Sequence, residues 1–135
     1  MYLLDTNILS SLLRRTPSTT LIAKLASVPL EQQHTSSITL GELTYGAYHY
    51  PDRTADLLRR FEEILRPDLP ILPFDAAAAR RYGELRAELE RIGRPIGDAD
   101  VRIGSIALVR GLTVVTGNVR HFRMIPNLAV ENWLE

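Results

Sequence analysis

Four acidic residues have the types and the sequence neighbours of a metal-binding site. Asp5 directly follows the apolar run YLL, Glu42 lies within TLGELTYGA, and Asp98 and Asp100 lie within PIGDADVRIGSIAL. The sequence has no cysteine, so a metal would have to be held by oxygen or histidine ligands. Carboxylates packed together without a cation repel one another, whereas carboxylate oxygens are suitable ligands for Mg²⁺ or Mn²⁺. A divalent ion held in this way activates water and offsets the negative charge of a phosphodiester.

Some of these acids also have a purely structural interpretation. Asp5 stands where a residue that caps the following helix would stand, and Asp98 is well placed to cap the helix that starts after Gly97. Residues two apart on a helix point to different faces, so Asp98 and Asp100 need not reach the same ion. We therefore predict that Asp100 is a metal ligand and that Asp98 is a cap or a secondary ligand.

Glu42 lies among small and apolar residues in a predicted helix. A carboxylate in such surroundings is costly unless a cation or a hydrogen-bond donor receives it. The alternative is that Glu42 lies on a solvated face of the helix. The neighbouring Gly41 costs about 1 kcal/mol relative to alanine inside a helix, which indicates that another group approaches closely there.

A polar turn follows the clearest apolar run of the sequence, LTVV. Asn118, in this turn, can accept a hydrogen bond or bind a metal weakly, but it adds no charge. An ordinary turn-forming role after Gly117 is the alternative.

Alternating strands and helices would position these residues. The pattern predicts strands over 2–4, 33–36, 71–72, 112–115 and 128–130. It predicts helices over 6–13, 18–27, 38–49, 52–65, 76–92 and 99–110, with caps at Ser18 and Asp75, a turn over 93–97 and a stop at Gly111. Such an alternation predicts an α/β fold with a central parallel sheet covered by helices on both faces. Sites in such sheets form at the carboxyl ends of the strands.

Composition limits the classes of protein that remain. With 135 residues and 45% hydrophobic side chains, the chain is long enough for one core and too short for two ordinary domains. No apolar run approaches the roughly 20 residues that span a bilayer, so we expect a cytoplasmic protein with no membrane partner. Positive and negative residues balance at a formal net charge of zero, and Lys24 is the only lysine. This balance permits a nucleic-acid substrate without requiring one.

Four motifs, taken in order, resemble those of the PIN-domain VapC toxins. They are LLDTNIL, ITLGELTYGA, PIGDADVRIGSIAL and VVTGNVRHF, and they extend over nearly the whole chain. The resemblance implies a single PIN domain over 1–135, with a three-layer α/β/α Rossmann-like fold. It matches the family's first three acids to Asp5, Glu42 and Asp100, with Asp98 as a frequent extra acid.

The same resemblance identifies supporting residues and two departures. Thr6 and Thr116 match hydroxyl residues that support the acids or the attacking water. Asn118 stands at the fourth acidic position, which leaves open whether one or two ions bind. Thr44 stands where an arginine often precedes the Tyr-Gly pair, which puts a phosphate contact in doubt.

The resemblance implies a Mg²⁺- or Mn²⁺-dependent endoribonuclease toxin that cuts tRNA or ribosomal RNA and leaves 5′-phosphate and 3′-hydroxyl ends. It also implies a VapB-type antitoxin as partner and a homodimer. Because of Asn118, a catalytically weakened PIN-like module that only binds RNA or a partner stays open as the alternative. A phosphoacceptor signalling domain lacks support because Lys24 does not follow a late strand.

Two further groups of residues have competing interpretations. His121 is predicted to be a surface or capping residue rather than a general base. Tyr45, Tyr48 and Tyr50 could stack on RNA bases. The spacing of Tyr45 and Tyr48, three residues apart on a predicted helix, favours packing instead.

Overall fold

A computed structural model of the chain describes residues 1–94 and 96–135. Its strands are Tyr2–Leu4 (β1), Gln33–Ser36 (β2), Ile71–Leu72 (β3), Thr113–Val115 (β4) and Val130–Glu131 (β5). They form a parallel sheet in the order β3-β2-β1-β4-β5. Since β1 is the central strand, the residue that follows it lies at the middle of the sheet's carboxyl edge.

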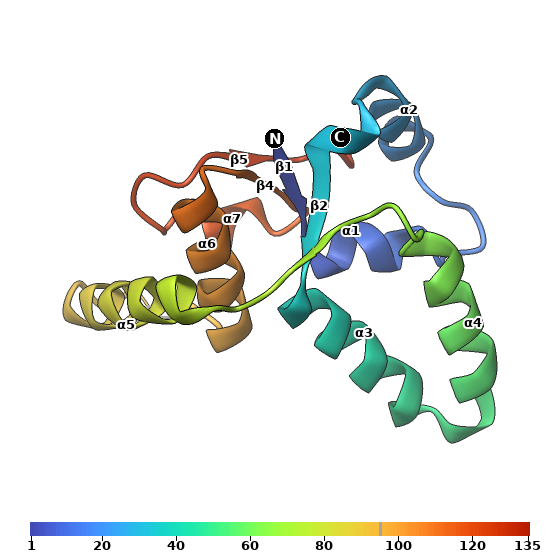
Figure 1. Cartoon of the computed structure of the whole chain (residues 1–135), viewed down its shortest axis with the longest axis horizontal. Coiled ribbons are helices and arrows are strands. Elements are labelled where there is room, and N and C mark those ends of the chain that lie inside the picture. The colour runs from blue at the N-terminus through green and yellow to red at the C-terminus, as the bar shows by residue number, and fades with distance from the viewer. Residues whose placement is uncertain (95) are drawn as a thin grey trace.

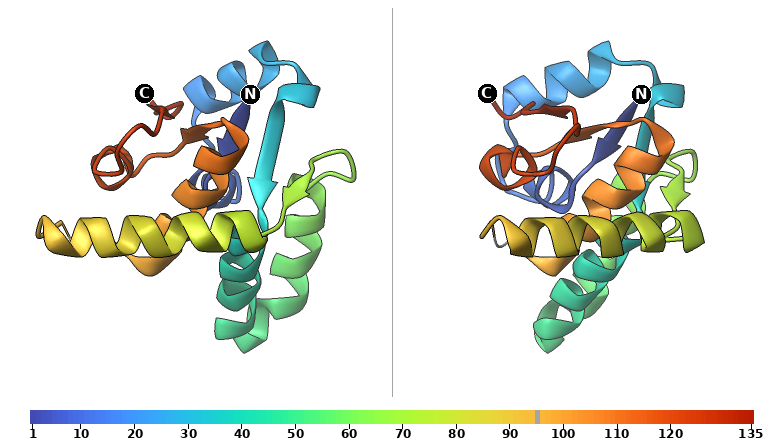
Figure 2. Two further views of the ribbon diagram at one scale, coloured as in Figure 1. Left: turned by 60° about the vertical axis from the view of Figure 1, so that its left-hand side comes forward. Right: turned by 90° about the vertical axis from the view of Figure 1, so that its left-hand side faces the viewer.

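Helices cover both faces of this sheet. They are Thr6–Ser11 (α1), Thr19–Ser27 (α2), Ser37–His49 (α3), Thr54–Ile64 (α4), Ala76–Arg91 (α5), Asp98–Arg110 (α6) and Val119–Phe122 (α7), with 3₁₀ turns at Leu30–Gln32 (η1) and Pro51–Arg53 (η2). Figure 1 shows α5, α6 and α7 on one side of the strands and α1, α3 and α4 on the other. The two further views show α3 and α4 side by side, projecting away from the sheet (Figure 2).

Two hydrophobic cores follow from the alternation of side chains along the strands. Leu3 packs in a cluster with residues of α5, α6 and α7, whereas the next residue, Leu4, packs in a cluster with residues of α1 to α4. Val114 and Val115 in β4 divide between the two clusters in the same way. The predicted parallel sheet with helices on both faces is thereby confirmed.

Local signals in the sequence set several helix ends correctly. Ser18 Oγ accepts a hydrogen bond from the Leu21 amide, and Asp75 Oδ1 accepts one from the Ala78 amide. Gly111 ends α6 with a φ of 66°, a left-handed conformation that glycine adopts without steric cost. All three predicted helix ends are confirmed. They could be predicted because each depends on contacts between neighbouring residues alone.

Other boundaries differ from the predicted ones. The first helix ends at Ser11, the segment expected as a helix over 52–65 begins with the turn η2, and the last strand lies at Val130–Glu131. The sequence pattern missed α7 altogether. The turn expected over 93–97 includes Pro95, which lies outside the described residues. Within the described ranges, no helix is long and apolar enough to cross a membrane.

Candidate active site

Asp5 lies directly after β1, at the centre of the carboxyl edge of the sheet. It occupies the N-cap position of α1, but its side chain makes no capping hydrogen bond. Instead, the Thr116 hydroxyl donates to Asp5 Oδ2 at 2.8 Å. Asp5 is only 4% exposed, so its carboxylate is almost fully removed from water. The interpretation of Asp5 as a simple cap is wrong.

The electrostatic environment of Asp5 is unfavourable for its charged form. Burial raises the pKa of the Asp5 carboxyl from 3.8 to about 6, although hydrogen bonds from the Thr116 hydroxyl and the Thr6 amide lower it. The negative charges of Asp100 and Glu42 raise this pKa further. Three acids from three parts of the chain therefore interact at this edge of the sheet.

Glu42 is held by the first residue of α1. The Thr6 hydroxyl lies 2.6 Å from Glu42 Oε1 and 3.1 Å from the hydroxyl of Thr39, which is fully buried. Glu42 itself is exposed, so the expected cost of burying its charge does not arise. Gly41 also differs from expectation, because a Cβ atom there would meet no atom within 4 Å. The close approach predicted at Gly41 is wrong.

Asp100 reaches the site from the first turn of α6. Its side chain is 19% exposed, and the Asn118 amide donates to its Oδ2 at 3.2 Å. His121 Nδ1 lies 3.5 Å from the same oxygen and 2.8 Å from Asn118 Nδ2. His121 is exposed, as predicted for a surface residue, but the short helix α7 also places it at the edge of the site, which the sequence did not predict.

A second missed residue, Asn7, supports the turn after β4. Asn7 Oδ1 accepts a hydrogen bond from the Gly117 amide at 3.1 Å. Within the same turn, the Thr116 hydroxyl accepts one from the Asn118 amide at 2.9 Å. A signal for Asn7 is its place in the motif LLDTNIL, two residues after Asp5. These hydrogen bonds hold the turn in place. The turn carries Thr116, which donates to Asp5, and Asn118, which donates to Asp100.

Asp98 has a different environment from the other acids. The N-cap of α6 is Gly97, without a side-chain hydrogen bond, so the prediction that Asp98 caps this helix is wrong. The Asp98 carboxylate accepts hydrogen bonds from the Tyr82 hydroxyl, from Arg86 at 3.1 Å and from Arg102 at 2.9 Å. The Tyr82 hydroxyl is the main cause that holds the pKa of Asp98 below its usual range, and Arg102 and Arg86 act in the same direction. The structure therefore pairs Asp98 with cations of α5 and α6, and Asp98 also lines one groove together with Glu42.

The donor set at the sheet edge suits a divalent ion in its chemistry. Among the described residues, no lysine or arginine forms an ion pair with Asp5, Glu42 or Asp100. The buried Asp5 carboxylate therefore lacks the positive partner that a buried charge requires. In the described part of the chain, no three histidine or acidic side chains are gathered closely enough to hold a metal ion as they stand. The oxygen donors and the uncompensated charge fit Mg²⁺ or Mn²⁺, and binding would have to draw the acids together.

A groove opens beside Glu42, between α3 and α6. Its volume is about 440 Å³. It is lined by Ser37, Ile38, Gly41, Glu42, Tyr45, Asp98, Ala99 and Arg102. A larger cavity, of about 700 Å³, lies between α2 and the C-terminal segment and includes none of the four acids. The smaller groove is the relevant one, because it adjoins the candidate site.

The tyrosines in and just after α3 are exposed, contrary to the expected packing of Tyr45 and Tyr48. Tyr45 is 69% exposed, Tyr48 62% and Tyr50 57%. The prediction that Tyr45 and Tyr48 serve packing is therefore wrong, and Tyr45 borders the groove beside Glu42.

Comparison with protein families and curated proteins gives consistent matches. The model of the PIN domain matches residues 2–127. The chain is 37% identical over 134 residues to the tRNA(fMet)-specific endonuclease VapC of Shigella flexneri, a match that covers 98% of this chain and 97% of that protein. It is 36% identical over 138 residues to ribonuclease VapC2 of Rickettsia felis, with 98% of each chain covered.

Solved structures show the same similarity. The crystal structure of VapBC2 from Rickettsia felis, bound to a DNA fragment from their promoter, matches with a TM-score of 0.88 and 35% identity, covering 98% of both chains. FitAcB from Neisseria gonorrhoeae matches with a TM-score of 0.87 and 35% identity, also over 98% of both chains. The fold and the order of its elements are thus shared with these proteins over nearly their full length.

Proposed function

This chain belongs to the PIN-domain family, among the VapC ribonucleases, and from that premise we propose that it is an endoribonuclease toxin of a toxin–antitoxin pair. One observation of the structure supports the proposal above all. A buried carboxylate, Asp5, lies beside two further acids and forms no ion pair with a lysine or arginine within the described residues. We propose that residues 1–135 form a single PIN domain around this site.

In this proposal, Asp5, Glu42 and Asp100 hold a Mg²⁺ or Mn²⁺ ion. When bound, such an ion supplies positive charge opposite the scissile phosphate and makes a nearby water more acidic. Asp98 is not among the proposed direct ligands, because both of its oxygens already accept hydrogen bonds from Tyr82, Arg86 or Arg102.

Neighbouring side chains orient the three acids. Thr116 donates to Asp5, Thr6 to Glu42 and Asn118 to Asp100. Outer partners of this kind fix the rotamers of ligands and reduce the reorganisation that binding requires. The exposed Glu42 carboxylate is accessible to substrate from the groove, and we propose in-line hydrolysis that leaves 5′-phosphate and 3′-hydroxyl ends.

Substrate and partners follow from the relatives. The Shigella flexneri relative is a tRNA(fMet)-specific endonuclease, and we propose a structured RNA, tRNA or ribosomal RNA, as the substrate of this chain in the cytoplasm. The matching crystal structures include VapBC2 and FitAcB, so we propose a small VapB-type antitoxin as partner. We also propose a homodimer, as the resemblance to VapC toxins implies.

A catalytically weakened module that binds RNA is the second candidate. Its support is Asn118, which places a neutral amide where the family often has a fourth acid. An amide that donates to Asp100 also uses one of the oxygens that an ion would need.

One experiment separates the two candidates. The purified chain is incubated with structured RNA in Mg²⁺ or Mn²⁺, with and without EDTA, beside the variants Asp5→Asn and Asp68→Asn. Asp68 is a matched control, since it is exposed and precedes β3 at the opposite edge of the sheet. We expect 5′-phosphate ends with the wild type and Asp68→Asn only, and none in EDTA. Cleavage that persists in EDTA or in Asp5→Asn would contradict the metal site, and RNA binding without cleavage in either metal would favour the binding module.

A further inference from the structure

The groove between α3 and α6 has features that the proposed hydrolysis does not need. The reaction requires Glu42, but the groove continues past it along α3 to Tyr45 and across to α6. We propose that this groove binds one unpaired nucleobase of the RNA, next to the phosphate that is cleaved. This inference rests on the proposed nuclease function and deepens it, because it names the residues that would bind a base beside the cleaved phosphate.

Tyr45 provides an aromatic surface at the right place. It lies three residues after Glu42, so both side chains project from the same face of α3. The residue as a whole is 69% exposed, and its ring stacks on His49 with 5.6 Å between ring centroids and 19° between planes, so a base would stack on the other face of the ring. Nucleobases that leave a helix stack on such aromatic side chains without needing a particular sequence.

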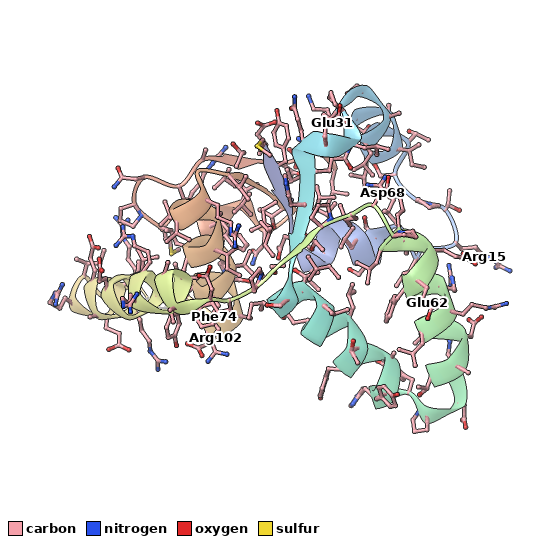
Figure 3. All side chains as sticks on the ribbon, viewed as in Figure 1. Arg15, Glu31, Glu62, Asp68, Phe74 and Arg102 are labelled. Atoms are coloured by element: carbon pink, nitrogen blue, oxygen red, sulfur yellow. The ribbon has the colours of Figure 1, made fainter. Side chains whose placement is uncertain are left out.

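The opposite wall supplies a positively charged plane. The guanidinium group of Arg102 lies 5.8 Å from the ring centroid of Phe74 and 5.4 Å from that of Tyr82, and Figure 3 shows Phe74 and Arg102 next to each other. Asp98 holds the same group at 2.9 Å, so its position is fixed. The Arg102 side chain stays 43% exposed and can meet a base or a phosphate from the groove. In this proposal, Asp98 does not bind metal but holds Arg102 in position at the groove.

Gly41 keeps the space between these walls open. A Cβ atom at this position would meet nothing within 4 Å, so a longer side chain would extend into the groove rather than into the protein. Gly46, in the same helix, also has open space around its Cβ position and does not line the groove. The two glycines therefore form a matched pair for a steric test.

Continuity with the candidate active site favours RNA as the occupant. Glu42 belongs both to the groove and to the acidic site, so a base held here is attached to a backbone that passes the acids. A groove with an exposed tyrosine on one side and an arginine on the other matches the alternation of bases and phosphates in a single strand.

The test measures binding separately from cleavage. A fluorescent adenine analogue, whose emission falls when it stacks, is placed at each loop position of an RNA hairpin in turn. Binding is followed in the Asp5→Asn background, so that the RNA stays intact. The same hairpin is also prepared with an abasic ribose at the position that responds. Cleavage of the unmodified hairpin by the otherwise wild-type chain is mapped in parallel.

We expect quenching at one loop position, adjacent to the mapped cleavage site. Tyr45→Ala and Gly41→Leu should each raise the Kd by about 5- to 150-fold, the range that loss of one stacked base implies. On the abasic RNA, both variants should bind with the same Kd as the Asp5→Asn parent, because the base that they would contact is missing. Gly46→Leu should bind as the parent does, and Tyr45→Phe should restore the quenching because it keeps a ring.

Three results would overturn the proposal. The first is an absence of quenching at every loop position, and the second is an unchanged Kd for RNA in Tyr45→Ala. The third is that Tyr45→Ala and Gly41→Leu lose affinity for an antitoxin peptide but not for RNA, which would make the groove a peptide site. Quenching that depends on Tyr45, in the absence of any cleavage, would support the base site and refute the nuclease function. The two proposals can thus fail separately.

Discussion

Asp98 and Asp100 lie two residues apart at the start of one helix, but their carboxylates have opposite surroundings. Asp98 accepts hydrogen bonds from Tyr82, Arg86 and Arg102, which satisfy its charge. The neighbours of Asp100 are the Asn118 amide and His121, and its own charge raises the pKa of Asp5. The comparison teaches that an acidic motif does not by itself identify a ligand. What distinguishes the two acids is whether a cation of the protein already neutralises them.

The largest expected effect is on cleavage by variants of these two acids. Asp100→Asn should lower the rate of RNA cleavage by more than about 100-fold, above the range typical for an outer partner of a metal ligand. Asp98→Asn should lower it by less than about tenfold, because Asp98 acts through the position of Arg102. Single-turnover cleavage of one defined RNA in Mg²⁺ measures both. Equal losses in the two variants would remove the distinction between a metal ligand and an ion-paired acid.

The next effect concerns stability and arises from Asp5. The folded protein holds a proton on Asp5 with a pKa of about 6, whereas the ordinary value is 3.8. Without divalent ions, the folded state therefore binds this proton more tightly than the unfolded state does. Its stability should fall as the pH rises through the window from about 4 to 6, by about 3 kcal/mol in total.

Asp5→Asn tests this directly. In EDTA at pH 7.5, the variant should have a higher free energy of unfolding than the wild type, by up to about 3 kcal/mol. At pH 3 the difference should be nearly absent, because Asp5 is then mostly protonated in both the folded and the unfolded wild type. Urea unfolding at both pH values measures it, and added Mg²⁺ should stabilise the wild type alone. A variant that is less stable than the wild type at pH 7.5 in EDTA would show that Asp5 is adequately compensated without a metal.

The sequence predicted those parts of the site that depend on chain-local patterns. The apolar run before Asp5 defines a strand, and the alternation of strands and helices places its end at the functional edge of the sheet. Ser18, Asp75 and Gly111 mark helix ends by contacts within a few residues. The three acids of the proposed metal site could also be predicted, because each lies in a short local motif that matches a motif of the family.

The remaining features depend on contacts between distant segments. The partners of Asp98 on α5, Tyr82 and Arg86, are 16 and 12 residues away, and they meet Asp98 only because α5 packs against α6. His121 reaches Asp100 through a helix of four residues, too short to show a periodic pattern. The exposure of Tyr45 depends on what packs against α3, which a spacing of three residues does not determine.

The smallest expected effect separates the two acids by the direction of their pH dependence. The Tyr82 hydroxyl, with Arg102 and Arg86, holds the pKa of Asp98 below its usual range. The ionised Asp98 therefore stabilises the fold at pH values above the pKa of an aspartate in the unfolded chain, and this contribution is lost as the pH falls below about 4. Since Asp98 is largely exposed, Asp98→Asn should lower the free energy of unfolding at pH 7.5 by less than about 1 kcal/mol, and less again in high salt. Asp5→Asn, by contrast, should raise the free energy of unfolding relative to the wild type, and this gain should grow as the pH rises. Urea unfolding of both variants from pH 3 to 7.5 compares them on one scale. If Asp98→Asn also stabilised the protein at pH 7.5 in EDTA, Asp98 would be an uncompensated acid like Asp5, and its exclusion from the metal site would have no electrostatic basis.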